Sequence, residues 1–542
     1  MFETVKTRPI EGQKPGTSGL RKKTRVFMQP DYLENFVQSV FNAIGGAKGK
    51  RFVVGGDGRY FNVPAIQTIL KMAAANDAAE VIVGQNGILS TPAASHLIRL
   101  NETDGGLILS ASHNPGGIDE DFGLKFNTPN GGPAPEGVTA AIFEQTCMLG
   151  SYSIANVDDV ALGSLGQAAI GEMKITIVDP VTQYQALMET LFDFDALRAL
   201  FASGFTMRFD AMHAVTGPYA MAILEQNLGA PAGTVMNGVP SEDFGGGHPD
   251  PNPVWAKALI DIMMAKDAPD FGAASDGDGD RNMIVGRGVY VTPSDSLAVL
   301  AANAHLAPGY AAGLAGIARS MPTSGASDLV AEKLEIASFE TPTGWKFFGN
   351  LLDAGKATIC GEESAGTGSN HVREKDGLWA VLLWLSILAA KRASVAQVMQ
   401  DHWRSFGRNY YSRHDYEAVP TQAANQVIKG IESRLDALPG QSFGGLTVTR
   451  ADNFSYLDPV DGSVSGNQGL RIWFDGGERA VLRLSGTGTE GATIRVYLEK
   501  YLPFEACAED DTQSVLGPLR DAVLMLSDMA TLTGRDAPDV YT

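Results

Sequence analysis

The chain has 542 residues, a formal net charge of −20 and three cysteines. Its 44% hydrophobic and 19% charged content is that of an ordinary globular protein and excludes an intrinsically disordered chain. The acidic balance argues against nucleic acid as a partner, because phosphate backbones bind basic surfaces.

The cysteines and the hydrophobic segments indicate the compartment. Cys147, Cys360 and Cys507 are far apart and odd in number, which predicts neither a disulfide framework nor a zinc site. The N-terminal sequence has no apolar core of a signal peptide. The most hydrophobic segment, 378–390, is shorter than the roughly 20 residues that cross a bilayer, and predicts a buried core helix. We therefore expect a cytoplasmic protein with no membrane partner.

Short apolar runs alternate with amphipathic stretches along most of the chain. The runs at 51–59, 79–85 and 105–115 are predicted strands that end in Gly-, Asp- or Ser-rich turns. Helix-like segments such as 64–76 lie between them. This alternation predicts βαβ units and a mainly parallel or mixed sheet.

The same pattern recurs at 205–286 and 314–366, and then the chain changes character. From about 408 it has closely spaced strands with polar turns, flanked by predicted helices at 420–437 and 510–532. The predicted fold class is α/β, with three related α/β domains and a C-terminal α+β domain. We place these domains at 1–180, 181–292, 293–405 and 406–542.

The first stretch with chemical potential is SASHNPGG, residues 110–117, directly after a predicted strand. A serine on a turn fixed by Pro and Gly, such as Ser112, can be a nucleophile or a phosphate carrier. His113 could orient or protonate it, and Lys125 is a nearby cation. Taken alone, the stretch is also an ordinary turn, because Ser, Asn, Pro and Gly are the usual turn residues.

The second stretch, SDGDGDRN, predicts a magnesium site. Asp276, Asp278 and Asp280 are oxygen ligands suited to a hard cation, Mg²⁺ or Ca²⁺. An EF-hand starting at Asp276 fails, because Arg281 and Arg287 occupy the positions of its Gly and Glu. An aspartate-nucleophile phosphatase would need Thr or Val at the position of Asp280. Arg281 could contact a phosphate oxygen on the metal, and a solvated acidic turn is the alternative.

The third stretch is RLSGTGTEGATIR, residues 483–495. It formally contains G-x-G-x-x-G, but a strand-like segment follows where a dinucleotide site needs a helix. Backbone N–H groups, hydroxyls and arginines here suit a phosphate dianion, with a plain hairpin as the alternative. The candidate side chains are those of Arg483, Ser485, Thr487, Thr489 and Arg495.

Two weaker stretches complete the set. In 360–377, Glu362 and Ser364 could bind sugar hydroxyls, and Arg373 and Lys375 could reach a phosphate. The basic segment 14–23 suggests an anion-binding loop, although a flexible basic N-terminus fits almost as well. Together, two separate anion-binding elements predict a substrate that is phosphorylated at both ends at some stage.

Seven stretches now carry a resemblance to a known family. TSGLRKK, SASHNPGG, ASDGDGDRNM, PTGWKFFGN, CGEESAGTGS, REKDGLW and RLSGTGTEGATIR occur in the order found in the α-D-phosphohexomutase family. The chain resembles the glucose-specific branch of that family over essentially its full length. The resemblance implies four domains around a central cleft. It also implies interconversion of glucose 1-phosphate and glucose 6-phosphate through a phosphoserine, with Mg²⁺ as metal and glucose 1,6-bisphosphate as intermediate and activator.

The resemblance also implies roles for individual residues. Ser112 would carry the phosphate and, with Asp276, Asp278 and Asp280, hold the metal. Arg21 and Arg281 would neutralise the transferring phosphoryl group, and Lys125 and His113 are unranked candidates for proton transfer. The implied substrate-binding residues are Arg21, Ser112, Asp280, Arg281, Thr343, Gly344, Glu362, Ser364, Lys375, Arg483, Ser485, Thr487 and Arg495.

The chain departs from the expected pattern at two places. Ser110 stands where Thr is expected, which keeps a hydroxyl, and Ala365 stands where Phe is usual, which weakens the case for strict glucose preference. The alternatives are a mutase for mannose or glucosamine phosphate, a magnesium-dependent phosphatase, and a non-catalytic scaffold. The expected partners are small sugar phosphates, and the expected assembly is a monomer or weak dimer.

Overall fold

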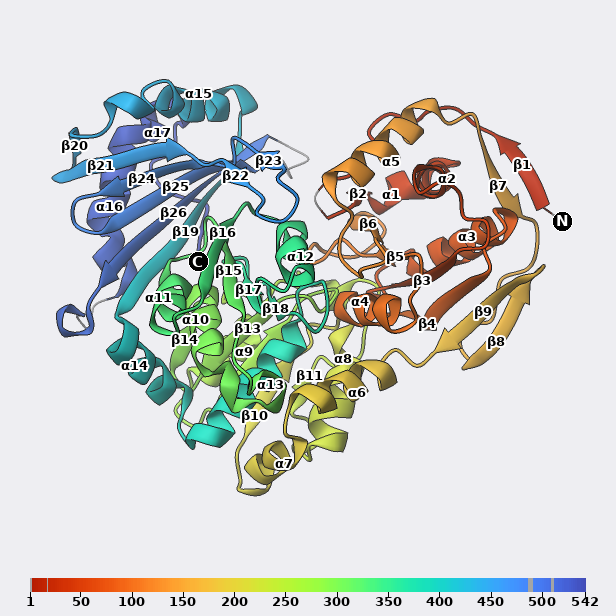
Figure 1. Cartoon of the computed structure of the whole chain (residues 1–542), viewed down its shortest axis with the longest axis horizontal. Coiled ribbons are helices and arrows are strands. Elements are labelled where there is room, and N and C mark those ends of the chain that lie inside the picture. Colours follow the sequence, from red (N-terminus) through yellow and green to blue (C-terminus); the bar gives the residue numbers. More distant parts are fainter. Residues whose placement is uncertain (1, 17, 486–490, 508–510) are drawn as a thin grey trace. The chain divides into compact units, whose positions relative to one another are not determined.

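The structure is a computed structural model that describes residues 2–16, 18–485, 491–507 and 511–542. It divides into two compact units (Figure 1). The segment 293–405, predicted as one domain, is shared between them. Unit 1 comprises Met1–Val291, Asn303–Ala315 and Gly344–Ala396, and unit 2 comprises Thr292–Ala302, Gly316–Thr343 and Gln397–Thr542.

Unit 1 begins with a seven-stranded mixed sheet. The inner strands β5, β3, β4 and β9 run parallel, and antiparallel strands flank them. The three predicted strands and the predicted helix are confirmed by β3, β4, β5 and α3. In sheet order the strands are β2 (Leu20–Lys23), β6 (Asp121–Asn127), β5 (Gly106–Leu109), β3 (Arg51–Gly56), β4 (Glu80–Ile88), β9 (Met173–Val178) and β8 (Gly166–Ile170), with α2 (Tyr32–Ala43), α3 (Asn62–Ala75), α4 (Thr91–Leu100) and α5 (Glu136–Met148).

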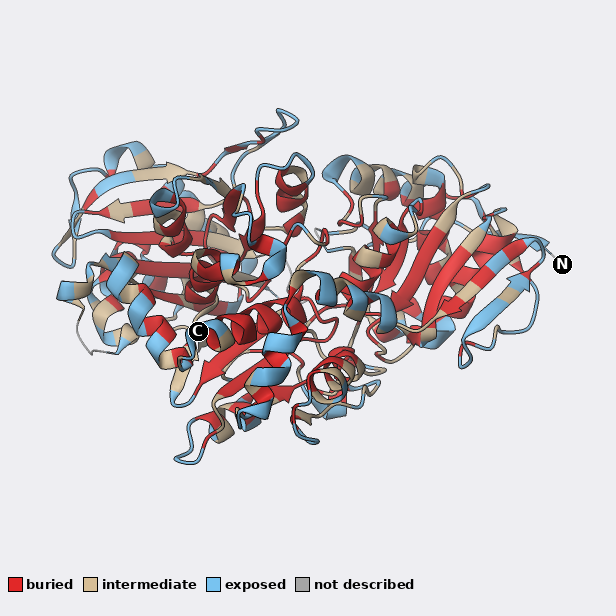
Figure 2. Ribbon diagram, turned by 60° about the horizontal axis from the view of Figure 1, so that its bottom comes forward, coloured by how far each residue is buried: buried red, intermediate tan, exposed pale blue. Residues whose placement is uncertain are grey.

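Alternation along β3 explains why helices cover this sheet. Phe52 and Val54 belong to the core cluster that includes α2 and α3, whereas Val53, also fully buried, lies on the other side of the strand. Both α3 and α4 pack on β3. A strand buried on both faces reads as a continuous apolar run, which is what residues 52–54 show. Figure 2 shows the strands as buried and the loops as mostly exposed.

A second sheet in unit 1 carries the acidic loop. Its strands β10 and β12 are parallel, and β13 returns antiparallel beside β12. The order is β11 (Val235–Met236), β10 (Met207–Asp210), β12 (Phe271–Ser275), β13 (Asn282–Gly286) and β14 (Val289–Val291). The other elements of unit 1 are β1 (Phe2–Lys6), α1 (Thr24–Phe27), β7 (Ser151–Ala155), α6 (Thr182–Leu191), α7 (Phe194–Ala202), α8 (Thr216–Ala220), α9 (Lys257–Met263), α12 (Trp345–Asp353), β17 (Ile359–Gly361), β18 (Thr367–Ser369) and α13 (Gly377–Lys391).

The hydrophobic segment at 378–390 forms α13, a buried helix, as predicted. Its side chains are buried from Leu378 to Leu388 and it packs on β13 and β18. Within the residues described, no single helix has both the length and the hydropathy of a membrane span. Only α13 taken together with the helix α14 (Val395–Phe406), which is sharply bent from it, passes that test.

Unit 2 is built on a seven-stranded antiparallel sheet with helices α15 and α16 packed against it, which confirms the predicted α+β character of the C-terminal region. The apolar faces of both helices contribute to one core with β24, β25 and β26. The strands are β20 (Ser442–Phe443), β21 (Leu446–Asn453), β24 (Leu470–Phe474), β25 (Glu478–Ser485), β26 (Ala492–Leu502), β19 (Arg408–Val419) and β27 (Val540–Tyr541), with β22 (Tyr456–Leu457), β23 (Val464–Ser465), α15 (Thr421–Glu432), α16 (Thr512–Ser527) and α17 (Met529–Thr533).

Residues 316–343 belong to unit 2 because of charged contacts with the C-terminal sheet. They form β15 (Gly316–Ser320), α11 (Ala326–Lys333) and β16 (Ala337–Thr341), and α10 (Pro293–Asn303) lies largely in the same unit. Arg479 of β25 donates to the carbonyl oxygens of Met321 and Thr323 at 3.1 and 2.7 Å. Glu499 of β26 accepts from the Gly325 N–H at 2.7 Å.

Asp295 on α10 provides a pH-dependent test of unit 2. Burial raises the pKa of this carboxyl to about 6, despite the opposing effect of Arg408. Between about pH 4 and 6 the unfolded chain releases the proton and the folded chain keeps it, so stability falls as pH rises. Asp295→Asn removes this term. The unfolding free energy of the variant, relative to the unmodified protein, is expected to rise across this range by up to about 3 kcal/mol and then level off.

Thermal unfolding at several pH values between 4.5 and 7.5 checks this expectation. Asp261→Asn is the matched control, because that carboxylate is 61% exposed and ion-paired only to Lys257 on the same helix. The control should show no such rise. A difference between Asp295→Asn and the unmodified protein that does not change with pH would contradict the role assigned to Asp295.

Candidate active site

Two loops that follow strand ends meet in unit 1. The loop after β5 carries Ser112, and the loop after β12 carries Asp276. The Ser112 hydroxyl donates to Oδ2 of Asp276 at 2.9 Å, and both residues are buried. Gly277 permits this approach, because a Cβ there would lie 2.4 Å from the Ser112 carbonyl oxygen. The predicted phosphate carrier and the predicted metal ligands therefore lie together.

The backbone of Ser112 is held in a strained conformation. Its φ is +53°, in the left-handed region, which costs a non-glycine residue about 1–3 kcal/mol. The Ser112 N–H donates to the Ser110 hydroxyl at 2.7 Å, and Nη2 of Arg59 donates to the Ser112 carbonyl at 2.8 Å. Arg59 is itself paired with Asp57 at 2.9 Å, and both side chains are fully buried. Both peptide groups next to the Ser112 side chain are therefore fixed.

Replacing Ser110 tests whether this restraint matters. Ser110→Ala removes the acceptor of the Ser112 N–H, so kcat is expected to fall by roughly ten- to a hundredfold, the scale of a small misplacement of a reacting group. Ser110→Thr keeps the hydroxyl and should retain most of the activity. Steady-state rates of both variants, with thermal unfolding beside them, give the answer. Equal rates for Ala and Thr at this position would contradict the restraint.

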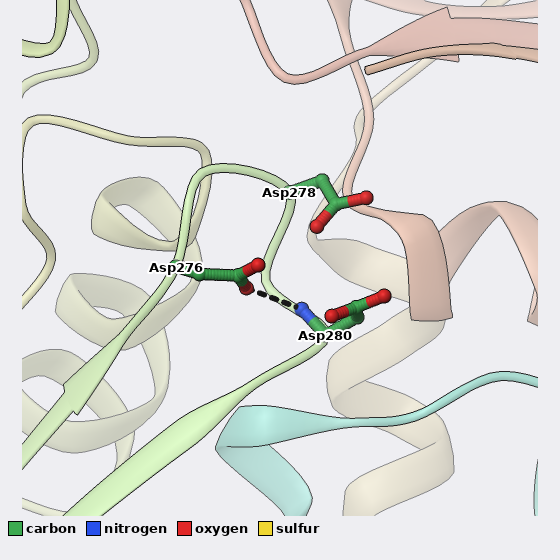
Figure 3. Close-up of side chains that lie close together, drawn as sticks. All are labelled: Asp276, Asp278 and Asp280. Carbon is green, nitrogen blue, oxygen red and sulfur yellow. Dashed lines mark hydrogen bonds between the residues drawn. The ribbon is translucent and has the colours of Figure 1, made fainter. Parts of the chain in front are cut away.

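Three carboxylates converge in the second loop, as Figure 3 shows. Asp276, Asp278 and Asp280 can place one oxygen each within 4.8 Å of the others. Oδ1 of Asp276 accepts from the backbone N–H groups of Asp280 and Arg281 at 2.9 and 3.0 Å. Oδ1 of Asp278 and Oδ1 of Asp280 are buried without a hydrogen-bond partner among the residues that the structure describes.

The electrostatics of this cluster fit a hard cation. Burial, and then the charges of Asp280 and Asp278, raise the pKa of Asp276 well above its ordinary value. The pKa of Asp278 is lowered despite burial, because Lys125 and Lys375 lie close to it. Buried carboxylates with unpaired oxygens are the donor set that hard divalent cations take. The residues present therefore fit a divalent metal ion.

Cationic side chains surround the carboxylates. Nζ of Lys375 lies 2.9 Å from Asp280, and Nζ of Lys125 lies 3.7 Å from Asp278. Arg21 is placed with them, and burial lowers its pKa, partly offset by Asp278. The Nε atoms of Arg21 and Arg281 are buried and have no hydrogen-bond partner in the described part of the chain. This arrangement can neutralise an anionic group beside Ser112.

The two candidates for proton transfer differ in charge. Nδ1 of His113 lies 3.4 Å from the Ser112 hydroxyl. Burial, and then Arg281 and Arg21, hold the pKa of His113 well below its ordinary value, so the imidazole is neutral near pH 7. Glu374 and Asp278 raise the pKa of Lys125 although burial opposes them, so it is a cation. The geometry does not rank the two.

The predicted sugar loop also lies in unit 1. Oε1 of Glu362 accepts from the Gly344 N–H at 3.0 Å. The Glu362 N–H donates to the Gly366 carbonyl at 2.8 Å, which closes the loop that contains Ser364. Gly366 pairs with Arg281, the residue after the acidic loop. The loop is thus held against the metal-binding segment, with Ser364 partly exposed.

The remaining predicted residues form a separate group in unit 2. Nη1 of Arg483 donates to the Thr343 hydroxyl at 2.6 Å, and its Nε donates to the Gln468 carbonyl at 3.1 Å. Nε of Arg495 lies 3.6 Å from Asp415. Ser485 ends β25. Thr487 and Thr489 lie outside the described residues.

Sequence reasoning missed several residues of the site. Asp57 and Arg59 follow β3 in GGDGR, a strand-end turn of the kind examined elsewhere in the chain, so the same rule could have found them. Thr91 donates to Asp278 at 2.7 Å and carries no sequence signal of its own. Glu374 accepts from Asn127 at 2.8 Å and from Lys125 at 3.3 Å, and its place beside Lys375 was the available signal.

Comparisons with protein families match almost the whole chain. Three models described as phosphoglucomutase/phosphomannomutase alpha/beta/alpha domains I, II and III match residues 12–150, 183–288 and 293–406. A fourth, described as the C-terminal domain of phosphoglucomutase-1, matches residues 408–539.

Individual proteins give the same result. The chain is 59% identical over 542 residues to a phosphoglucomutase of Rhizobium radiobacter, covering 100% of both chains. It is 50% identical to a probable cytoplasmic phosphoglucomutase of Arabidopsis thaliana, covering 99% of both. The crystal structure of the phosphoprotein pp63/parafusin, a phosphoglucomutase from Paramecium in its open form, is similar with a TM-score of 0.92 and 48% identity, covering 100% of this chain and 99% of that one.

Proposed function

Because the chain belongs to the α-D-phosphohexomutase family, in its glucose-specific branch, we propose that Ser112 is the residue that carries the phosphate in its reaction. The activity is that of a phosphoglucomutase, an isomerase that interconverts α-D-glucose 1-phosphate and glucose 6-phosphate. The reaction passes through a phosphoserine and a glucose 1,6-bisphosphate. The observation that supports Ser112 most is its bond to Asp276 inside a cationic, buried loop pair.

In the proposed cycle, the bond between phosphorus and Oγ of Ser112 breaks as phosphorus bonds to the free sugar hydroxyl. The hydroxyl proton goes to His113 or Lys125. The bisphosphate then presents its other phosphate, which returns to Oγ of Ser112 and leaves the isomeric monophosphate. Arg21 and Arg281 stabilise the charge on the phosphoryl oxygens, and such charge stabilisation is the main contribution to phosphoryl transfer.

Asp276, Asp278 and Asp280, with an oxygen of the phosphate on Ser112, would hold Mg²⁺. When bound, the metal would neutralise charge on the transferring group. Mg²⁺ is proposed over Ca²⁺ because few protein oxygens converge here, and Mg²⁺ usually pairs one to three carboxylates with a phosphate oxygen.

We assign the substrate contacts to two groups of residues. Gly344, Glu362 and Ser364 would bind sugar hydroxyls, and Lys375 would help to hold the bisphosphate. The phosphate that is not reacting would be bound by residues of unit 2, namely Thr343, Arg483, Ser485, Thr487 and Arg495. The arginines support this, because a guanidinium binds a phosphate through two parallel hydrogen bonds.

The cellular setting is proposed on similarity alone. Sugar phosphates are the substrates, with no nucleic-acid or membrane partner proposed. Relatives include both cytoplasmic and chloroplastic phosphoglucomutases, and we propose the cytoplasm for this chain. A monomer or weak dimer and the four-domain division at 1–180, 181–292, 293–405 and 406–542 remain predictions.

Mass spectrometry tests the role of Ser112. The purified protein is incubated with labelled glucose 1-phosphate and Mg²⁺, and its intact mass and tryptic phosphopeptides are measured. One phosphate on Ser112 that exchanges label with substrate is the expected result. No phosphate on Ser112 with glucose 1,6-bisphosphate present would overturn the proposal. Steady release of inorganic phosphate would favour the phosphatase, and mannose 1-phosphate and glucosamine 1-phosphate test the sugar preference.

A further inference from the structure

A chain of buried hydrogen bonds in unit 1 joins residues that the proposed mechanism does not use. Ser369 ends β18, and its Oγ lies 2.7 Å from Nδ1 of His371. Nε2 of His371 lies 2.9 Å from Oδ2 of Asp376. This is the connectivity of the Ser-His-Asp triad of hydrolases.

The burial of these groups excludes a hydrolytic role. Ser369 and Asp376 have 0% exposure, and the His371 side chain has 1%. The Ser369 hydroxyl is also engaged by the Tyr310 hydroxyl at 2.6 Å. A nucleophile must reach its substrate, so these three residues act on their surroundings and not on a bound ligand.

The direction of every bond in the chain follows from its two ends. Nε1 of Trp379 can only donate, and it lies 2.7 Å from the Tyr310 hydroxyl. The Tyr310 hydroxyl therefore donates to Ser369, and the Ser369 hydroxyl donates to Nδ1 of His371. An ionised Asp376 can only accept, so the proton of a neutral His371 is on Nε2. The network has one arrangement of protons.

Asp376 is the point at which the network meets the active-site segment. Its Oδ1 accepts from the Tyr184 hydroxyl at 2.6 Å and from the Trp379 N–H at 3.0 Å, which caps the start of α13. Its own N–H donates to the Thr367 carbonyl at 2.8 Å. The preceding residue, Lys375, points to Asp280, with Nζ 2.9 Å from the carboxylate.

We propose that His371 and Asp376 are positioning residues for Lys375. They fix the short segment between β18 and α13 from its buried side, so that the ammonium group of Lys375 is held beside Asp280. The segment carries its charged side chains on one side and its anchoring side chains on the other. This inference rests on the proposed function, in which Lys375 helps to hold the bisphosphate.

A double-mutant cycle tests the coupling. His371→Leu removes both side-chain hydrogen bonds and is expected to lower kcat/KM by roughly ten- to a hundredfold. In a Lys375→Met background the same change should lower kcat/KM by less than about threefold, because the group it positions is gone. A merely structural role of His371 would give equal losses in both backgrounds, and that result overturns the inference. No loss from Lys375→Met alone would instead contradict the proposed role of Lys375.

Two further measurements keep the test decisive if His371→Leu does not fold. His371→Gln can still donate to Asp376 and should recover most of the activity lost in His371→Leu. Tyr184→Phe removes one donor to Asp376 and keeps the ring, so its loss of kcat/KM should also shrink in the Lys375→Met background. In ¹⁵N-histidine NMR spectra of the full chain, the His371 signal should be that of a neutral imidazole protonated at Nε2. An Nδ1–H tautomer would contradict the assigned direction of the chain.

Discussion

Ser112→Ala is expected to lower kcat by about 10⁶-fold, the scale of loss when a covalent nucleophile is removed. The reason is that Oγ both receives and returns the phosphate in the proposed cycle. Stability should change little, because the only side-chain bond lost is the one to Asp276, a contribution of about 1 kcal/mol. Formation of glucose 6-phosphate from glucose 1-phosphate, measured with glucose 1,6-bisphosphate present, gives the rate.

Ser112→Gly is the matched control for folding. It loses the same hydroxyl and relieves the positive φ of this residue, so it should be inactive and at least as stable as Ser112→Ala. Residual activity of either variant within a hundredfold of the unmodified protein would exclude Ser112 as the phosphate carrier.

Asp278→Asn is expected to weaken Mg²⁺ binding by more than about 100-fold, since losing a partner of a ligand alone costs 10–100-fold. It replaces a carboxylate whose Oδ1 is unpaired and leaves the charges of Lys125 and Lys375 less opposed. The rate at saturating Mg²⁺ should fall by roughly 10³-fold, the lower end of what one charge-stabilising group supplies in phosphoryl transfer. Titration calorimetry with Mg²⁺ and steady-state rates measure the two effects.

Thr91→Val separates the ligand from its support. It removes the hydrogen bond to Asp278 and keeps the carboxylate, so its effect on Mg²⁺ affinity should be clearly smaller than that of Asp278→Asn. Equal affinities for Mg²⁺ in Asp278→Asn and the unmodified protein would exclude Asp278 as a ligand.

Sequence reasoning found those parts of the site that follow from local chemistry. Ser112 and Asp276 each follow a strand end, and parallel strands bring such ends to one edge of a sheet. Asp57 and Arg59 obey the same rule and were missed, because an acid and a base two residues apart also read as an ordinary surface pair. Only the fold shows that both are buried against the Ser112 loop.

The division of 293–405 between two units could not be predicted. It depends on bonds such as those from Arg479 to the Met321 and Thr323 carbonyls, which join residues far apart in the sequence. Periodicity reports the elements of a segment correctly, as it did for α13, but it carries no information about which distant partners a charged side chain will find.

The bonds between residues 316–343 and the C-terminal sheet also bear on how the chain is made. During synthesis, Met321, Thr323 and Gly325 leave the ribosome well before Arg479 and Glu499, whose side chains complete their contacts. At about 5–20 residues per second, the wait is roughly ten to thirty seconds. The middle of the chain therefore reaches its final packing only when its last third has been translated, and a nascent chain arrested before Arg479 would leave β15 and β16 unfinished.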